Sequence, residues 1–114
     1  MNTLHFGKKF FSSKGKNVVI VGAKRTPIGS FMGQFKDMST TSLGAAACRG
    51  AIEHSGLTPK DIEEAFLGCV IQAGLGQAPD RQAVLGAGCD IGTPSTSINK
   101  VCASGMKSVM LAAT

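Results

Sequence analysis

The stretch SINKVCASGMK, residues 97–107, decides the fold. Residues 96–99 have the length and composition of a short strand, and residues 103–114 predict a helix, so a strand passes into a helix within a few residues. Cys102 falls at this junction. The N–H groups of a helix's first turn have no partner inside the helix, and they carry its positive dipole end. We therefore expect the Cys102 thiol to lie where negative charge is stabilised.

A thiol in that position suits nucleophilic chemistry. A helix N-terminus favours the thiolate, which is the nucleophilic form of cysteine. Ala103, Ser104 and Gly105 are small and would let a substrate approach the sulfur. A strand–Cys–helix turn is the thiol counterpart of the nucleophile elbow of serine hydrolases, and a backbone N–H there can hold a carbonyl oxygen that gains charge. The alternative interpretation is that Cys102 is a buried small residue, as free cysteines commonly are.

Outward from this stretch, strands alternate with helices. A helix begins at one of the hydroxyl residues 40–42 and stops at Ser55-Gly56, a turn opens at Thr58-Pro59, and a second helix is expected over residues 79–87. Strands are expected over residues 18–21, 65–71 and 96–99. A strand followed by a helix thus occurs three times in succession. This order predicts an α/β fold with right-handed crossovers. The expected core face of the first helix consists of Leu43, Ala46, Ala47, Gly50 and Ala51, with Arg49 and Glu53 on its outer side.

Charge is distributed unevenly along the 114 residues. Residues 1–36 contain seven Lys or Arg and no acid, whereas residues 37–114 contain five basic and seven acidic residues. The basicity therefore belongs to the front of the chain, and aromatic residues that would stack on bases are few, which argues against a nucleic-acid partner. No apolar run has the length of a membrane span.

The first 17 residues have the composition of a separate segment. They are basic and acid-free, and they mix bulky apolar with small polar residues, which is typical of a mitochondrial presequence. A frayed N-terminus is the alternative. We expect residues 1–17 to precede a partial domain, residues 18–114, and expect a mitochondrial matrix location, with the cytoplasm as the alternative.

The other candidate groups are interpreted as structural. Cys48, Cys69 and Cys89 have no C-x-x-C spacing, so neither a metal site nor a disulfide is expected, and each is assigned to the core or a loop. His54 is interpreted as a surface side chain, and His5 lies in the expected presequence. Three further groups are set aside: the glycine pairs 74/76 and 86/88 do not complete a phosphate-binding loop, and Lys100 and Lys107 are interpreted as solvated.

Three ordered motifs carry a family resemblance. Residues 99–107, NKVCASGMK, resemble the acyl-enzyme signature of thiolases, as do VIVGAKRTPIG at residues 19–29 and GQAPDRQA at residues 76–83. The Cys-Ala-Ser-Gly-Met variant is most similar to that of the acetyl-CoA acetyltransferases of mitochondria. Asp80 stands where the family often has a small or neutral residue.

The resemblance implies an α/β thiolase-like fold, of which this chain is the front part of the N-terminal αβα domain. It implies that Cys102 takes an acetyl group from one acetyl-CoA and that a second acetyl-CoA condenses with it to give acetoacetyl-CoA and CoA. The CoA thioester is then substrate and no separate cofactor or metal is expected. A homodimer or homotetramer is implied, with residues 96–99 near the dimer contact. The alternatives are a truncated, non-catalytic interaction module of a thiolase and a 3-ketoacyl-CoA thiolase acting on longer chains.

The same resemblance implies catalytic groups that these 114 residues do not contain. They are a histidine in a Gly-His-Pro motif, an Asn or His in an Asn-Glu-Ala-Phe-type motif, and a second cysteine near a Cys-x-Gly motif. None of these motifs occurs in the sequence. We therefore expect this chain alone to be inactive in turnover.

Overall fold

The computed structural model describes residues 17–114. Apart from Asn17, the expected presequence lies outside the described residues. The described chain forms three α-helices, two strands and one short 3₁₀ helix. In chain order these are α1 (Thr40–Ser55), η1 (Pro59–Asp61), β1 (Ala65–Gly68), α2 (Pro79–Gly86), β2 (Ser95–Ile98) and α3 (Ser104–Ala112).

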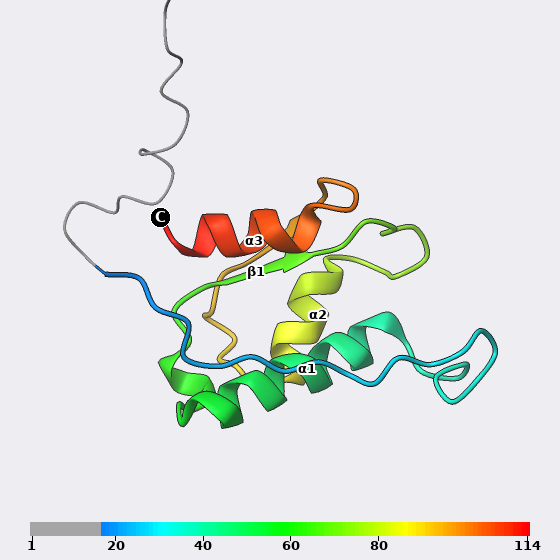
Figure 1. Ribbon diagram of the computed structural model, residues 1–114, viewed down its shortest axis with the longest axis horizontal. Helices are drawn as coiled ribbons and strands as arrows, with labels where there is room; N and C mark the ends of the chain where they lie inside the picture. Colours follow the sequence, from blue (N-terminus) through cyan, green and yellow to red (C-terminus); the bar gives the residue numbers. More distant parts are fainter. Residues whose placement is uncertain (1–16) are drawn as a thin grey trace, which may run out of the picture.

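The two strands form a parallel pair. Ala65 lies opposite Ser95, and Gly68 lies opposite Ile98. Helix α3 lies on one side of this pair and α2 on the other, while α1 packs on the outer side of α2 (Figure 1). The strand–helix–strand connection through α2 therefore joins parallel strands, as the α/β prediction requires.

Helix α1 begins and ends at signals that the sequence contains. The Ser39 hydroxyl oxygen accepts a hydrogen bond from the Ser42 N–H at 3.1 Å, so the cap lies one residue before the predicted 40–42 range. Gly56 has a φ of 76°, and its N–H donates to the Glu53 carbonyl. This left-handed end residue favours glycine and confirms the predicted stop.

The α1–α2 contact depends on glycines. A Cβ added at Gly44 would lie 3.1 Å from the Ala83 Cβ, and one added at Gly86 would lie 2.9 Å from the Ala45 Cβ. The helices therefore approach closely, and Ala45 is the buried residue of α1. The predicted core face was wrong in part, because it included Ala46, which is exposed.

Arg49 has a partner that the sequence analysis did not foresee. Its side chain is exposed, as predicted, but its guanidinium reaches across to α2 and donates to the Gly86 carbonyl oxygen at 2.5 Å. Gly86 is the last residue of α2, so this charged donor satisfies one of the carbonyls that a helix end leaves without a partner. Arg49 therefore joins the two helices.

The predicted strand over residues 18–21 is absent from the described structure. Its four side chains are exposed, Ile20 at 82% of its surface. β-branched residues favour a strand only where a neighbouring strand takes up the backbone hydrogen bonds, and β1 and β2 pair with each other instead. The segment runs along α1 (Figure 1), where the Ala23 N–H donates to His54 Nδ1 at 3.2 Å.

The remaining boundaries follow the sequence closely. Pro59 opens η1 after Thr58, whose N–H and hydroxyl both donate to the Asp61 carboxylate at 2.7 Å. Strand β1 ends at Gly68, three residues before the predicted end, and β2 begins at Ser95, one residue before the predicted start. Within residues 17–114, no helix is both long and apolar enough to cross a membrane.

Candidate active site

Cys102 lies in the turn between β2 and α3 (Figure 1). Its side chain is exposed and its thiol is free. The preceding residue, Val101, has a φ of 48°, in the left-handed region that a β-branched residue adopts only under strain. The predicted strand–Cys–helix turn is therefore present, with the backbone strain one residue before the sulfur.

Asn99 fixes the start of this turn. Its side-chain Nδ2 donates to the Val70 carbonyl at 3.0 Å, and its Oδ1 accepts from the Val101 N–H at 3.1 Å. One amide thus connects the chain after β1 with the strained residue before Cys102. In the sequence, only its position at a strand end marks Asn99 as a residue that could hold the turn.

Ser104 makes hydrogen bonds that the sequence pattern did not indicate. It is 3% exposed, its hydroxyl accepts from the Lys100 N–H at 2.9 Å, and it donates to the Val101 carbonyl at 2.6 Å. It therefore links the backbone of Lys100 and Val101 to the first residue of α3. The turn around Cys102 is held by side-chain hydrogen bonds at both of its ends, since Asn99 holds the other one.

Two glycines determine how much room lies on either side of the turn. A Cβ at Gly68 would lie 2.7 Å from the Gly105 backbone nitrogen, so β1 and the start of α3 are in direct backbone contact. A Cβ at Gly105 would meet nothing within 4 Å. The start of α3 is thus packed tightly against β1 at Gly68, whereas a Cβ at Gly105 would point into open space.

Asp80 and Arg81 attach α2 to β2 and to the loop before it. The Asp80 carboxylate is 4% exposed and accepts a hydrogen bond from the Ser97 hydroxyl. Burial tends to raise the pKa of Asp80, but hydrogen bonds from Ser97, from Ser95 and from the backbone lower it, and the net pKa is lowered. Arg81 donates to the carbonyls of Ile91 and Thr93, the latter at 2.5 Å.

This environment predicts a pH dependence of stability. A lowered pKa in the folded chain means that ionised Asp80 stabilises the fold above the usual carboxyl pKa of about 4. That stabilisation is lost as the pH falls through the lower, folded value. In Asp80→Asn, the unfolding free energy should therefore fall less steeply as the pH is lowered below about 4 than it does in the wild type. Urea unfolding at several pH values measures this difference.

A double variant isolates the hydrogen bond from other effects. Ser97→Ala removes one donor to Asp80 and should shift the loss of stability toward higher pH in the wild-type background. The same change in the Asp80→Asn background should have no such pH effect. If the unfolding free energy of Asp80→Asn fell with decreasing pH as steeply as that of the wild type, the stabilising role of ionised Asp80 would be contradicted.

Of the other predicted groups, Cys69 lies next to the Cys102 turn in the fold, since its neighbours Gly68 and Val70 contact Gly105 and Asn99. His54 accepts the Ala23 N–H at the far end of α1, and it is exposed as predicted. Cys69 follows β1 instead of lying within it, and it is half-buried. Cys48 and Cys89 share a cavity, described below. Among the described residues no three His, Cys, Asp or Glu side chains form a group suited to a metal ion.

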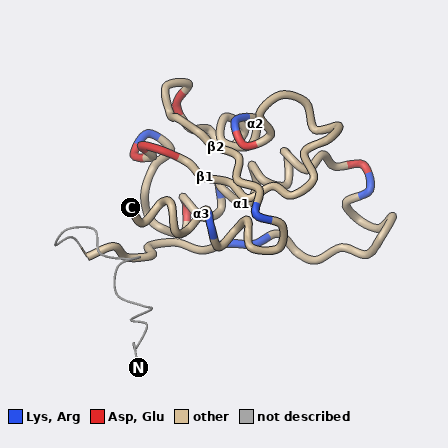
Figure 2. Tube along the Cα trace, turned by 90° about the horizontal axis from the view of Figure 1, so that it is seen from above, with Lys and Arg blue, Asp and Glu red and all other residues tan. Residues whose placement is uncertain are grey.

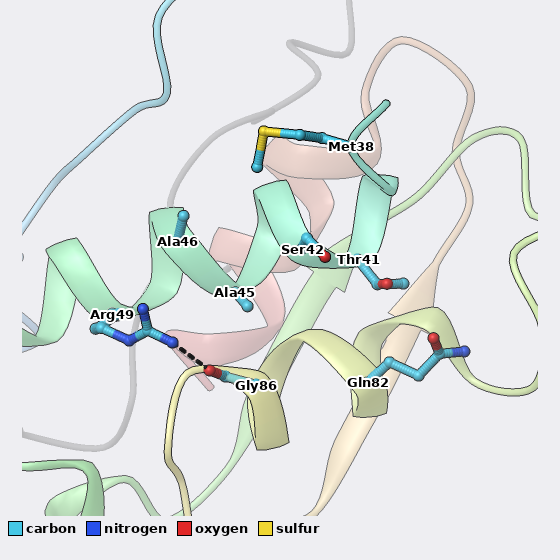
Figure 3. A pocket seen from close by; sticks show the side chains of 8 residues that line it. All are labelled: Met38, Thr41, Ser42, Ala45, Ala46, Arg49, Gln82 and Gly86. Carbon is cyan, nitrogen blue, oxygen red and sulfur yellow. Dashed lines mark hydrogen bonds between the residues drawn. The ribbon is translucent and has the colours of Figure 1, made fainter. Parts of the chain in front are cut away.

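A cavity of about 490 Å³ lies between α1 and α2 and contains no nucleophilic thiol (Figure 3). It is lined by Met38, Thr41, Ser42, Ala45, Ala46, Arg49, Gln82 and Gly86. None of the four cysteines lines this cavity.

Figure 2 shows basic and acidic residues dispersed over the described chain.

Comparison with known proteins decides the family. Residues 18–114 match the profile described as "Thiolase, N-terminal domain". The chain belongs to the thiolase family. Among solved thiolases, the Acat5 thiolase from Ascaris suum in complex with coenzyme A superposes with a TM-score of 0.83 at 39% identity, covering 86% of this chain and 26% of that one. An acetyl-CoA acetyltransferase from Syntrophomonas wolfei gives 0.77 at 33% identity, covering 83% and 24%. The α/β thiolase-like fold is thus confirmed.

Curated relatives of this thiolase segment are named acetyl-CoA acetyltransferases. The mitochondrial protein of Macaca fascicularis is 60% identical over 97 residues, which are 85% of this chain and 23% of the relative. Acetyl-CoA acetyltransferase B, mitochondrial, of Xenopus laevis is 54% identical over 112 residues, 96% of this chain and 27% of the relative. This chain therefore spans about a quarter of the length of the relatives that it matches.

Proposed function

We propose that this chain provides the acyl-carrying nucleophile of an acetyl-CoA acetyltransferase, with Cys102 as the residue that becomes acetylated. The observation that carries the proposal is the exposed thiol at a strained strand-to-helix turn. The names of the relatives support it, and so does the Ascaris suum thiolase, which was solved in complex with coenzyme A.

The first half-reaction uses atoms that the described turn holds. Cys102 Sγ attacks the acetyl-CoA carbonyl carbon and forms a new S–C bond. The tetrahedral oxygen gains charge, and the Cys102 N–H is proposed to hold it in part. Collapse breaks the bond to the CoA sulfur, which leaves as a thiolate and takes up a proton. Asn99 and Ser104 position the sulfur without touching the reacting atoms.

The second half-reaction forms a carbon–carbon bond. A second acetyl-CoA loses a proton from its methyl carbon, and that carbon attacks the acetyl group on Cys102. The Cys102 thiolate leaves, and acetoacetyl-CoA is released. Proton removal needs a base. His54 bonds to Ala23 at the far end of α1, so the base is sought among the groups implied by the resemblance, the Gly-His-Pro histidine and the second cysteine, whose motifs these residues do not contain.

The location is inferred from the relatives' names and from the sequence, and the assembly from the family resemblance. The relatives above are named mitochondrial. Together with the basic, acid-free first 17 residues, this supports a mitochondrial matrix location with residues 1–17 as the targeting segment. Assembly as a homodimer or homotetramer is part of the same proposal.

Acyl trapping tests the assignment directly. The chain is incubated with acetyl-CoA, quenched in acid and digested with trypsin, which places each cysteine in its own peptide. We expect the acetyl group on residues 101–107, and hydroxylamine should remove it because it is a thioester. Acetylation confined to the peptide of residues 82–100, which contains Cys89, would overturn the assignment. No acetylation of any peptide would favour the non-catalytic interaction module.

A further inference from the structure

A small apolar cavity of about 190 Å³ contains two of the four thiols. Cys48 of α1 and Cys89, just after α2, both line it, and the other lining residues are aliphatic. Ile52, Ile62 and Val84 form much of this wall, and Val84 is 2% exposed. The two cysteines therefore line one apolar cavity, and Cys102 is not among its lining residues.

The packing of α1 on α2 explains why these residues meet. Ala45 lies against Gly86, with 2.9 Å between the Ala45 Cβ and a Cβ built at Gly86. Cys48 is three residues beyond Ala45, and Cys89 is three residues beyond Gly86. Gly88, with a φ of 97°, turns the chain back at this point. The two cysteines thus continue the same helix–helix contact.

The surroundings raise the pKa of both thiols. Burial raises the pKa of Cys48, and the neighbouring Cys89 raises it further, since two thiolates would repel each other. Burial also raises the pKa of Cys89. Among residues 17–114, neither thiol donates a hydrogen bond, in contrast to Cys69, whose Sγ donates to the Ile71 carbonyl at 3.7 Å. No polar partner in this part of the chain competes with a bond between the two sulfurs.

We propose that Cys48 and Cys89 form a modification site, a dithiol that a hydroperoxide converts into an intramolecular disulfide. Cys48 is the half-buried member and Cys89 the buried one, so peroxide reaches Cys48 first. The site does not depend on Cys102 or on the proposed acetyl transfer.

The atoms and electrons of this step balance. Because the pKa of Cys48 is raised, its thiolate forms mainly in alkaline solution, where hydroxide takes the proton. The Cys48 thiolate attacks one peroxide oxygen, the O–O bond breaks, and a sulfenic acid and, after protonation of the released hydroxide, one water result. Deprotonated Cys89 then attacks the Cys48 sulfur, expels hydroxide, and a second water forms on protonation. Two thiols are oxidised by two electrons, and one hydrogen peroxide is reduced to two waters. A thiol reductant reverses the cross-link.

Peptide mapping tests the pairing with the chain as it stands. Trypsin separates the cysteines into residues 37–49 (Cys48), 61–81 (Cys69), 82–100 (Cys89) and 101–107 (Cys102). After treatment with hydrogen peroxide and alkylation of the remaining thiols, we expect peptides 37–49 and 82–100 to be joined, with the loss of two hydrogen atoms. Dithiothreitol should release them. The cross-link should also raise the thermal midpoint, since it closes a loop in the unfolded chain.

Matched variants separate this pairing from random oxidation. Cys69→Ser should leave the 37–49 to 82–100 link unchanged, and Cys102→Ser should leave it unchanged while removing the exposed thiol. Cys89→Ser should abolish the link. If that variant fails to fold, the map of the wild-type chain still decides the question. Separate alkylation of both peptides after oxidation, or a predominant link through Cys69 or Cys102, would overturn the proposal.

Discussion

Cys102→Ser is expected to abolish acetyl transfer. A serine hydroxyl in the same turn is a far weaker nucleophile than a thiolate, and an ester is a poorer acyl donor to the second substrate than a thioester. The loss should be on the order of 10⁴-fold or more in kcat, as in other enzymes that lose their nucleophile. The measurement is acetoacetyl-CoA formation by a chimera in which residues 18–114 replace the matching quarter of a full-length relative.

Cys89→Ser is the matched control for this experiment. Cys89 is buried beside Cys48, and the same substitution there removes a thiol without touching the proposed site. The chimera carrying it should retain its rate if it remains folded, which circular dichroism reports. A Cys102→Ser chimera that still condenses acetyl-CoA at the parent rate would contradict the role of Cys102.

Gly68→Val is expected to give the largest loss of stability. The Gly68 Cα faces the backbone of Ser104 and Gly105, and any Cβ there would lie 2.7 Å from the Gly105 nitrogen. Backbone atoms cannot rotate away as a side-chain end can, so α3 has to separate from β1. Overpacking of this kind costs about 1–3 kcal/mol, and a branched side chain belongs at the upper end. Urea unfolding measures the difference in free energy.

The control for Gly68→Val lies on the opposite side of the same contact. A Cβ at Gly105 would meet nothing within 4 Å, so Gly105→Ala adds a methyl group without a clash. Replacing a helical glycine by alanine should stabilise α3 slightly, by about 0.5–1 kcal/mol. Equal unfolding free energies for Gly68→Val and the wild type would contradict the close approach of β1 and α3.

Local signals were sufficient for most helices. Pro79 opens α2 as the sequence predicts, and Gly56 ends α1, because a fixed φ and a left-handed φ are properties of single residues. The parallel pairing of β1 with β2 also follows from strand–helix–strand order. The Cys102 turn could be predicted because it required only a strand, a cysteine and a helix in immediate succession.

Long-range contacts explain what the sequence did not predict. Residues 18–21 have strand composition, but a strand also requires a neighbour at hydrogen-bonding distance, and composition does not report one. The helix-joining contact of Arg49 was missed because its partner is a carbonyl 37 residues away on α2. The sequence indicated only that Ser104 is small. Its hydroxyl hydrogen-bonds to the backbone of Lys100 and Val101, and the shape of that turn could not be predicted from the sequence.

The left-handed backbone at Val101 has a consequence for how this region evolves and can be engineered. A glycine at position 101 would adopt the same φ without steric cost. We therefore expect Val101→Gly to raise the stability of the fold. Valine retains a stiff, conformationally restricted backbone at this position. The positive φ of Val101 thus costs the fold some stability, and the stiff valine restricts the backbone next to Cys102. A redesign that aims only at stability would select Val101 for replacement first. Because Val101 lies next to Cys102, we expect that it should be kept.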